Sequence, residues 1–414
     1  MARCIAALGH APATGFGESL GAAISGTPPE AFDDFALAAA RLSLLERVPR
    51  QLGSAFRLHP LLAELVRNRA DKDAAFFRIT EWFLARLPEG GEDQGLRWRE
   101  VSEEIAALIE WLARVSPADR ARVGRTSMRY AVINGPFHAW VRFCDEGLNS
   151  ELAAADRSIM LWILTQAALR GGIADRALVA ARERRELDLK RGADRDAAMS
   201  AGFIADILQA RGQLDEALKI RNQEELPAYD RLGDASLRAG AMGKIADILQ
   251  ARGQLDEALK IRNEEQLPVY DRLGDVRERA VTTGKIADIL QARGQLDEAL
   301  KIRNEEELPV YERLGDVRSR AVTMGQIADI LQARGQLDEA VRIRREEVLP
   351  VYERLGDVHS LLRGRANLAR ILLGRGQTAD RAEARRLLCL ARDEARRLKL
   401  PEAQRIERML EQAG

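Results

Sequence analysis

Two overlapping segments near the amino terminus carry residue types that could do chemistry. Residues 17–21, Gly-Glu-Ser-Leu-Gly, fit the pattern that presents a nucleophilic serine between a buried strand and a helix. The residues before it do not predict a strand, so we interpret the match as chance, at the start of a helix. Residues 12–19 come nearest to a phosphate-binding loop, but Glu18 replaces its lysine, and a carboxylate repels phosphate. The sequence therefore predicts neither a serine nucleophile nor a phosphate cradle here.

No other group of side chains predicts a catalytic or metal site. The histidines are scattered, without a cysteine–histidine spacing that suits zinc: His10, His59, His138 and His359. The three cysteines are far apart and odd in number, which fits reduced thiols in a cytosol better than disulfides. Acidic pairs such as Glu264–Glu265 fall on predicted helix surfaces, where carboxylates are solvated. We expect a cytoplasmic protein that is not an enzyme and uses no cofactor or metal.

The overall charge gives no field that would attract nucleic acid or an anionic membrane, since 64 basic residues balance 64 acidic ones. The local balance is uneven. Residues 1–120 carry 14 basic and 17 acidic groups, whereas residues 361–414 carry 13 and 7. The apolar runs are too short to span a membrane. We expect no membrane partner, and the acidic first part argues against nucleic acid.

Most of the chain is a tandem array. Residues 243–283 and 284–324 are each 41 residues long and match at 37 positions. The run Ala-Arg-Gly-Gln recurs at this period, beginning at Ala210, Ala251, Ala292 and Ala333. Repeats of this length form solenoids in which one supersecondary unit stacks on the next.

One repeat, residues 274–314, predicts two helices. Asp275 is a suitable N-cap for a helix over 276–293, and Gly294 a suitable C′ residue. A second helix begins near Leu296. Pro309 lies about twelve residues into it, where it lacks a donor and crowds the preceding turn, so we expect a kink or break. The same proline recurs at Pro227, Pro268 and Pro350.

The repeat resembles the tetratricopeptide family in a long variant, through its small and large packing residues: Ile286, Ala287, Leu290, Gly294, Leu296 and Ala299. The resemblance implies an all-α fold, a right-handed solenoid of helix-turn-helix repeats. It is close over residues 194–377 and looser before them.

In that family the first helix of each pair lines a concave surface. The resemblance places a ladder of carboxylates and amides there: Asp206, Gln209, Asp247, Gln250, Asp288, Gln291, Asp329 and Gln332. Such a ladder suits a basic or extended protein segment held by many weak contacts. At the next equivalent positions Arg370 and Leu373 end the ladder. The alternative is that recent duplication and solubility alone account for these residues.

A second ladder is basic. Where the family usually has a large apolar residue on the second helix, this chain has Arg221, Arg262, Arg303 and Arg344. We expect each stem to cover apolar surface while the guanidinium pairs with the glutamate three residues on, namely Glu224, Glu265, Glu306 or Glu347. The alternative is an arginine ladder that recognises an acidic partner.

The amino-terminal part predicts a different module. A helix from Pro28 to about Ser43 is followed by a hairpin that turns through residues 49–53, and then by a helix over 60–69. Helix, hairpin and helix is the winged-helix pattern. Residues 42–45 and 56–62 resemble the winged helix of STAND-type signalling NTPases of the NB-ARC kind, and residues 103–112 resemble the helix that joins it to their repeats.

The STAND resemblance implies that His59 contacts a nucleotide diphosphate, although Pro60 replaces the acidic residue often found next. Without a phosphate loop, the alternative for His59 is a packing role. We expect a winged-helix-like domain with one hairpin over 1–70, degenerate repeats over 71–193, regular repeats over 194–377 and capping helices over 378–414.

The function that the sequence favours is a protein-interaction scaffold or ligand-sensing arm of a STAND-like protein, without enzymatic activity. It would bind a protein or peptide along the concave surface, and self-association is compatible with the pattern. The alternative function is a transcriptional regulator that binds DNA through the winged helix.

Overall fold

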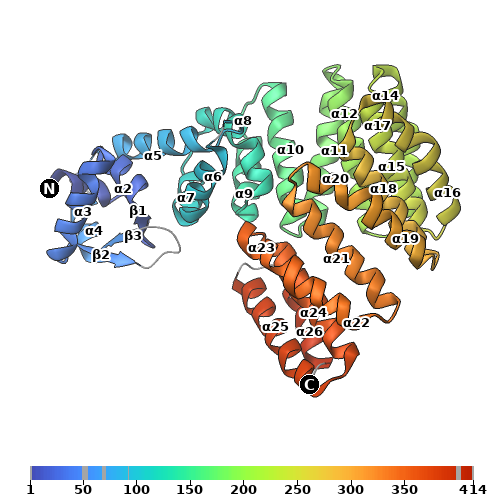
Figure 1. Cartoon of the computed structure of the whole chain (residues 1–414). Helices are drawn as coiled ribbons and strands as arrows, with labels where there is room; N and C mark the ends of the chain where they lie inside the picture. Colours follow the sequence, from blue (N-terminus) through green and yellow to red (C-terminus); the bar gives the residue numbers. More distant parts are fainter. Residues whose placement is uncertain (1, 49–54, 68–70, 92, 398–401, 413–414) are drawn as a thin grey trace. The chain divides into compact units, whose positions relative to one another are not determined.

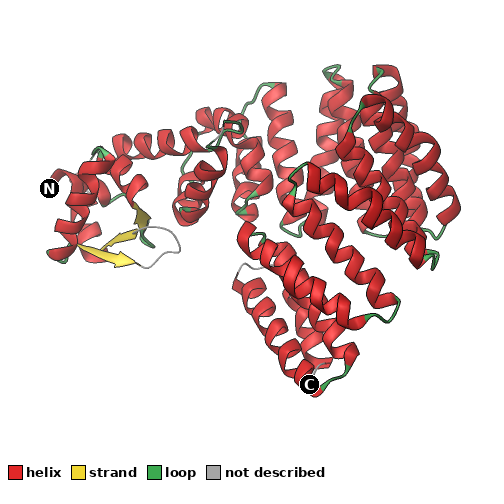
Figure 2. Cartoon of the chain, in the orientation of Figure 1, coloured by secondary structure: helices red, strands yellow, loops and turns green. Residues whose placement is uncertain are grey.

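The computed structural model describes residues 2–48, 55–67, 71–91, 93–397 and 402–412. The chain divides into two compact units, residues 1–193 and 194–414, and each is described by itself (Figure 1). Both units are built from helices, and a small sheet lies in the first (Figure 2). The predicted all-α solenoid with a small sheet-containing module is confirmed. None of the helices in the described ranges is long and apolar enough to cross a membrane.

Unit 1 opens with a small mixed module. Its elements are α1 Ala2–Leu8, β1 Phe16–Gly17, α2 Glu18–Ser25, α3 Pro29–Arg41, β2 Leu45–Val48, β3 Ala55–Leu58 and α4 Pro60–Arg67. Strand β3 lies between β1 and β2 and is antiparallel to both. The predicted hairpin is formed by β2 and β3, and β1 adds a third strand that the prediction did not include. The predicted turn over 49–53 lies outside the described residues.

Aromatic packing holds this module together. Phe16, Phe32 and Phe56 are fully buried, and the rings of Phe32 and Phe56 meet edge to face at 6.5 Å. Gly21 allows this packing, since a Cβ atom there would lie 2.4 Å from the Phe32 ring. The second glycine of the Gly-x-Ser-x-Gly pattern therefore has a packing role.

The rest of unit 1 is helical. The helices are α5 Lys72–Arg86, α6 Gln94–Glu103, α7 Ile105–Leu112, α8 Pro117–Ile133, α9 Phe137–Leu148, α10 Ala154–Arg170 and α11 Ala174–Lys190. The side chains of Asp71 and Ser116 cap α5 and α8 by accepting from backbone N–H groups of the first turn. Phe83 stacks on Trp111 with ring centroids 4.7 Å apart, which fixes α5 against α7.

Unit 2 contains the regular repeats. Their first helices are α12 Asp194–Ala210, α15 Ala235–Ala251, α18 Val276–Ala292, α21 Val317–Ala333 and α24 Val358–Arg375. As predicted, Asp275 is an N-cap: its side chain accepts a hydrogen bond of 3.0 Å from the backbone N–H of Glu278. Gly294 follows the helix with φ +79, the left-handed conformation expected of a C′ glycine. Both predicted ends of this helix are confirmed.

Each second helix has three consecutive parts, an α segment, a π-helical turn and another α segment. They are α13 Leu214–Ile220, η1 Arg221–Glu225 and α14 Leu226–Leu232; α16 Leu255–Lys260, η2 Ile261–Gln266 and α17 Leu267–Leu273; α19 Leu296–Ile302, η3 Arg303–Glu307 and α20 Leu308–Arg313; α22 Leu337–Arg342, η4 Ile343–Val348 and α23 Leu349–Leu355. In each π turn the residue before the proline donates its N–H to the carbonyl five residues back, as Leu308 does to Arg303.

The proline does not break the second helix, so of the two predicted outcomes, a kink or a break, the break is excluded. Ile302, Arg303 and Leu308 all have right-handed helical dihedral angles. A proline ring crowds the carbonyl four residues earlier and donates no hydrogen bond. Widening the preceding turn relieves that conflict, and the chain continues as a helix through Pro309.

Two further helices, α25 Thr378–Arg397 and α26 Glu402–Gln412, close unit 2 at its carboxyl end. Helix α25 packs against α24 and α26. Leu388 of α25 is fully buried and Ile406 of α26 nearly so, in one core cluster with Leu372 of α24. The end of the array therefore has an apolar face covered by its own helices, as solenoids require for solubility.

Candidate binding groove

Each regular repeat holds a buried arginine that pairs with the aspartate of its own first helix. Arg221, Arg262, Arg303 and Arg344 are at most 3% exposed. The Nη2 atoms of Arg221, Arg262 and Arg344 lie 2.6 Å from an aspartate Oδ1, and Arg303 pairs in the same way; the aspartates are Asp206, Asp247, Asp329 and Asp288. The two predicted ladders are therefore halves of one internal network.

The Nη atoms of these guanidinium groups donate to acceptors of the repeats. The Nε atoms are buried without a hydrogen-bond partner among the described residues, in Arg221, Arg262, Arg303 and Arg344. The second partner lies four residues on, where Arg221 donates to Glu225 at 2.6 Å and Arg262 to Gln266 at 2.7 Å. The backbone carbonyl of a first-helix glycine also accepts, as Gly243 does from Arg262 at 3.0 Å. Charge-assisted bonds of this kind are what a buried arginine requires.

The prediction that each arginine pairs with the glutamate three residues on was wrong. Glu224, Glu265 and Glu306 are exposed, and the ion pairs run to the residue four on and to the first helix. The helix turns the fourth residue towards the interior and the third towards solvent. The alternative, an arginine ladder that recognises an acidic partner, has no support at Arg303, because this side chain is fully buried.

Burial dominates the electrostatics of this network. It raises the pKa of the Glu225 and Glu307 carboxyls above the ordinary value, although their arginine partners act in the opposite direction. It also lowers the pKa of the Arg262 guanidinium, whose second partner is the neutral Gln266. The network holds the charge of the arginines inside the protein.

The aspartate ladder is consequently not a free acidic surface. The four aspartates keep between 25% and 35% of their side-chain area exposed. Besides the buried arginine, Asp206 pairs with Lys244 of the next repeat at 3.2 Å, and Asp247 with Lys285 at 3.5 Å. The negative charge along the first helices is compensated, which weakens the expected preference for a basic partner.

A groove lies between the last two first helices of the array, and we refer to it as the repeat groove. It encloses about 410 Å³. Its lining comes from α21, η4, α23 and α24, and the residues are Arg318, Val322, Gly325, Gln326, Asp329, Arg344, Val348, Tyr352, Ser360, Arg363, Gly364 and Asn367. Apolar, amide and charged groups converge there, a combination typical of sites that hold a peptide or small ligand.

None of the predicted amides is among the residues that line this groove. Gln209, Gln250, Gln291 and Gln332 are all partly buried. Asp329 lines the repeat groove, but the lining residues from α21 do not include Gln332 and instead include Gln326. Sequence reasoning missed Gln326 and Asn367, whose equivalents are Lys244 and Lys285 in earlier repeats. Because the type changes from repeat to repeat, no repeating pattern marked this position.

Comparison with solved structures gives proteins built from helical repeats. A Rap protein complexed with competence and sporulation factor superimposes with a TM-score of 0.51 at 12% identity, over 81% of this chain and 96% of that one. A STAND protein with a tetratricopeptide repeat sensor, from Pyrococcus horikoshii, gives 0.49 at 11% identity, over 100% of this chain and 62% of that one. This chain has a tetratricopeptide-type fold. At these identities the likeness concerns the fold alone.

No protein-family model matches this sequence, and no curated protein sequence matches it either.

The predicted nucleotide-sensing residue in unit 1 has no phosphate cradle beside it among the described residues. His59 is exposed between β3 and α4. In the segment nearest to a phosphate loop, the backbone N–H of Gly17 donates to Glu104 at 2.6 Å. A carboxylate occupies the position that a phosphate oxygen would need. The nucleotide-sensing role and the packing role of His59 both stay predictions.

Ser19 is held by hydrogen-bond donors. Trp82 Nε1 lies 3.1 Å from its Oγ atom and Arg86 Nη2 lies 2.9 Å from it. A short strand does precede this serine, contrary to our prediction, but β1 belongs to an antiparallel sheet rather than to the parallel sheet of a nucleophile elbow. The surroundings of Ser19 support the interpretation of a chance match.

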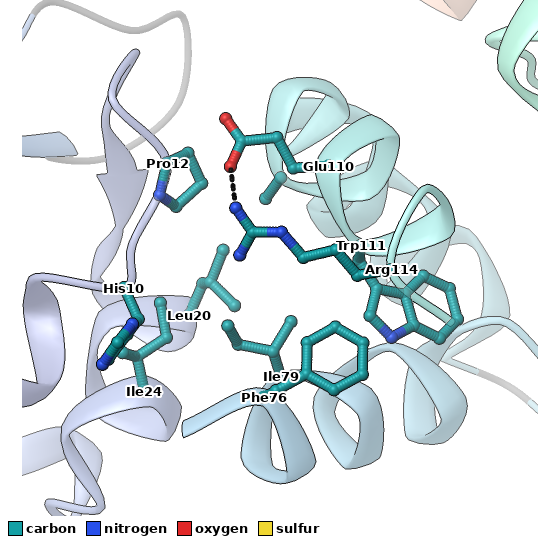
Figure 3. A pocket seen from close by; sticks show the side chains of 10 residues that line it. His10, Pro12, Leu20, Ile24, Phe76, Ile79, Glu110, Trp111 and Arg114 are labelled. Carbon is teal, nitrogen blue, oxygen red and sulfur yellow. Dashed lines mark ion pairs between the residues drawn. The ribbon is translucent and has the colours of Figure 1, made fainter. Parts of the chain in front are cut away.

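The small pocket of unit 1 is a packing defect rather than a ligand site. It lies among α2, α5 and α7, where Leu20, Ile79 and Trp111 surround a space of about 10 Å³ (Figure 3). Arg114 and Glu110 pair across its edge at 3.7 Å. This volume holds about one water molecule. Among the residues with described positions, no cluster of His, Cys, Asp and Glu could hold a metal ion.

Proposed function

We propose that this chain is a non-enzymatic interaction module whose repeat groove binds an extended peptide or protein segment. The observation that carries the proposal is the repeat groove itself, a hollow of about 410 Å³ lined by apolar, amide and charged side chains of consecutive repeats. Concave surfaces of repeat arrays commonly serve as binding surfaces. The Rap protein of similar fold, which was solved with a bound factor, supports this reading.

Main-chain recognition suits the groove better than recognition by charge. Asp329 is already paired with Arg344 at 2.6 Å, so its carboxylate has little unbalanced charge to offer. Asn367 and the predicted ladder of Gln209, Gln250, Gln291 and Gln332 could donate to and accept from an extended backbone. We therefore propose an extended partner that does not need to be basic.

The finer role that we propose is the sensing arm of a STAND-like protein in the cytoplasm. Its support is the order of the sequence segments, a winged-helix-like module followed by residues 103–112 and then by repeats. Free Cys4, Cys144 and Cys389 agree with a reducing compartment. Self-association is a further proposal, compatible with the repeat pattern.

The alternative, DNA binding through the winged-helix-like module, has less support. Helix α3 precedes the hairpin and is the element that would enter a groove of the duplex. Its exposed residues include Glu30, Asp33 and Asp34. Carboxylates on that face would meet the phosphate backbone and repel it.

The proposal can be tested by panning a phage-displayed library of linear peptides against the full chain. Selected peptides should bind the wild type and lose about tenfold or more in affinity with Val322→Lys, a partly exposed groove residue. Lys301→Ala is the matched control, since this side chain is 69% exposed on a second helix. Equal losses in both variants, or no selected peptide, would contradict a groove site.

The contribution of the amide ladder is tested separately with the triple variant Gln250→Ala, Gln291→Ala and Gln332→Ala. A selected peptide that spans several repeats should bind this variant more weakly than the wild type. Unchanged affinity would remove the ladder from the proposal and confine binding to the repeat groove.

A further inference from the structure

A second hollow lies at the carboxyl end of unit 2, between α24 and α26, and we refer to it as the end pocket. It encloses about 600 Å³, more than the repeat groove. Its lining residues are Leu362, Arg363, Ala366, Asn367, Arg370, Leu373, Glu402, Arg405, Ile406 and Met409. Neither the repeat pattern nor the groove ladder assigns a role to it.

The end pocket has an apolar floor and a basic rim. Leu362 and Ile406 are buried, and Leu373 and Met409 are partly buried. Arg363, Arg370 and Arg405 are exposed, and all three line the pocket. Such a site offers apolar contact below and cationic donors above.

Two of these arginines have no ion-pair partner among the residues that the structure describes. Arg370 lies 3.5 Å from Asp329. Arg363 and Arg405 form no ion pair with any described residue, whereas nearby Arg365 pairs with Glu353 at 3.1 Å. Unpaired cations at the mouth of an apolar pocket are complementary to a ligand that carries carboxylates.

One acidic group opposes them. Glu402 lines the pocket, and its Oε1 atom lies 3.6 Å from Nδ1 of His359. Three arginines against one glutamate leave the pocket cationic, with or without a proton on His359. The charge of the end pocket is thus positive, whereas the aspartate ladder predicted a negative surface for the array.

We propose that the end pocket binds an amphipathic acidic segment of the partner, with apolar side chains on Leu373 and Met409 and carboxylates at Arg363 and Arg405. The end pocket shares Arg363 and Asn367 with the repeat groove. A segment that lies in the repeat groove therefore continues directly into the end pocket. This inference rests on the proposed function and adds the charge and polarity of the partner.

The test uses labelled linear peptides of alternating leucine and glutamate, and matched peptides with glutamine or lysine in place of glutamate. The wild type should bind the glutamate peptide at least about tenfold more tightly than the others. It should also bind it less tightly at high salt, because exposed charges are screened. Free glutamate and citrate serve as competitors.

The variant is the double substitution Arg363→Glu and Arg405→Glu, with Arg363→Gln and Arg405→Gln as a milder pair. Both double variants should bind the glutamate peptide with an affinity about tenfold or more lower than that of the wild type. The control is the double substitution Arg381→Glu and Arg386→Glu. It changes the net charge by the same amount, at exposed α25 residues outside the pocket. It should bind as the wild type does, and circular dichroism must show equal helicity in all variants.

The outcomes separate the inference from the function. If the glutamine peptide binds as tightly as the glutamate peptide and Val322→Lys abolishes both, the groove stands and the acidic preference is refuted. If neither peptide nor any selected library peptide binds, both proposals fail. If citrate competes as well as the peptide does, the pocket takes small acids and the proposed segment is wrong.

Discussion

At the scale of single residues, the buried arginine explains how these repeats keep a charged group in their core. The stem of Arg303 lies in the interior, while its guanidinium donates to Asp288, Glu307 and Gln326. Three acceptors in fixed positions give the pair of helices one preferred alignment. The repeat with Gln266 shows that the second acceptor does not need a charge, since Arg262 still donates to it at 2.7 Å.

We predict that the free energy of unfolding of Glu307→Gln increases relative to that of the wild type as pH rises. Burial raises the pKa of Glu307 in the folded protein above its unfolded value. The stability that this group contributes is therefore complete below its unfolded pKa and is lost as pH rises through the folded pKa. Urea unfolding of wild type and variant between about pH 4 and pH 7 should show the difference move in favour of the variant.

The control for this prediction is Asp357→Asn, which should show the opposite trend. Burial alone would raise the pKa of Asp357, but hydrogen bonds from Ser360 and Arg318 outweigh it and hold the pKa below the usual range. The stability that Asp357 contributes is complete above its unfolded pKa and is lost as pH falls through its folded pKa. If the wild type instead became more stable relative to Glu307→Gln as pH rises towards neutral, the raised pKa of Glu307 would be contradicted.

At the scale of elements, the packing of the second helix of a repeat requires close approach to the first helix. A π turn widens the helix before Pro309, and the same turn begins at Arg303. The side chain of Glu307 then reaches so close to α18 that a Cβ atom at Gly284 would lie 2.5 Å from its carboxylate. Glycine at this position is a packing requirement, because the acceptor for the arginine lies against it.

We predict that two equivalent glycine substitutions have opposite effects. Gly284→Ala should lower the free energy of unfolding by about 1–2 kcal/mol, because Glu307 must leave its bonds with Arg303 and Thr323. Gly325→Ala should raise it by about 0.5–1 kcal/mol, since Val348 replaces the glutamate and the nearest atom, on Arg344, is 3.6 Å away. Urea unfolding of both full-length variants measures the pair. Equal signs would show that the clash does not control stability.

At the scale of the molecule, repetition makes unit 2 modular. Ion pairs link equivalent positions of successive repeats, as Arg293 does with Asp256 at 3.2 Å and Arg334 with Asp297 at 3.0 Å. Each of these ion pairs joins the same two positions of the repeat. Stability in such an array is approximately a sum over repeats and their interfaces.

We predict that deletion of residues 284–324 leaves a folded protein. The deletion joins Thr283 to Gly325, which occupies the position of Gly284, so the next interface is rebuilt from equivalent residues. Helicity per residue, measured by circular dichroism, should equal that of the wild type, and the midpoint of urea unfolding should fall.

An out-of-phase deletion is the control for the repeat prediction. Removal of residues 284–304 joins a first helix to the end of a second one and leaves apolar faces without a partner. This protein should aggregate or lose helicity. If both deletions behave alike, the repeats are not independent units.

The sequence by itself determined the period, the helix ends and the fold type. Capping by Asp275 and the left-handed turn at Gly294 are local, because each depends on the backbone within one turn. The 41-residue repetition predicted the stacking, since each unit has an apolar face that only a neighbour covers.

Only the tertiary structure decided which side chains meet. Arg303 and Asp288 are fifteen residues apart and lie on different helices, so their pairing follows from helix packing and not from spacing along one helix. Arg363 and Arg405 come together across α24 and α26, where the repeat pattern has ended. The basic excess of residues 361–414 was visible in the sequence. Contacts between distant segments depend on how whole elements pack, and for that reason the sequence did not show that these arginines surround an apolar pocket.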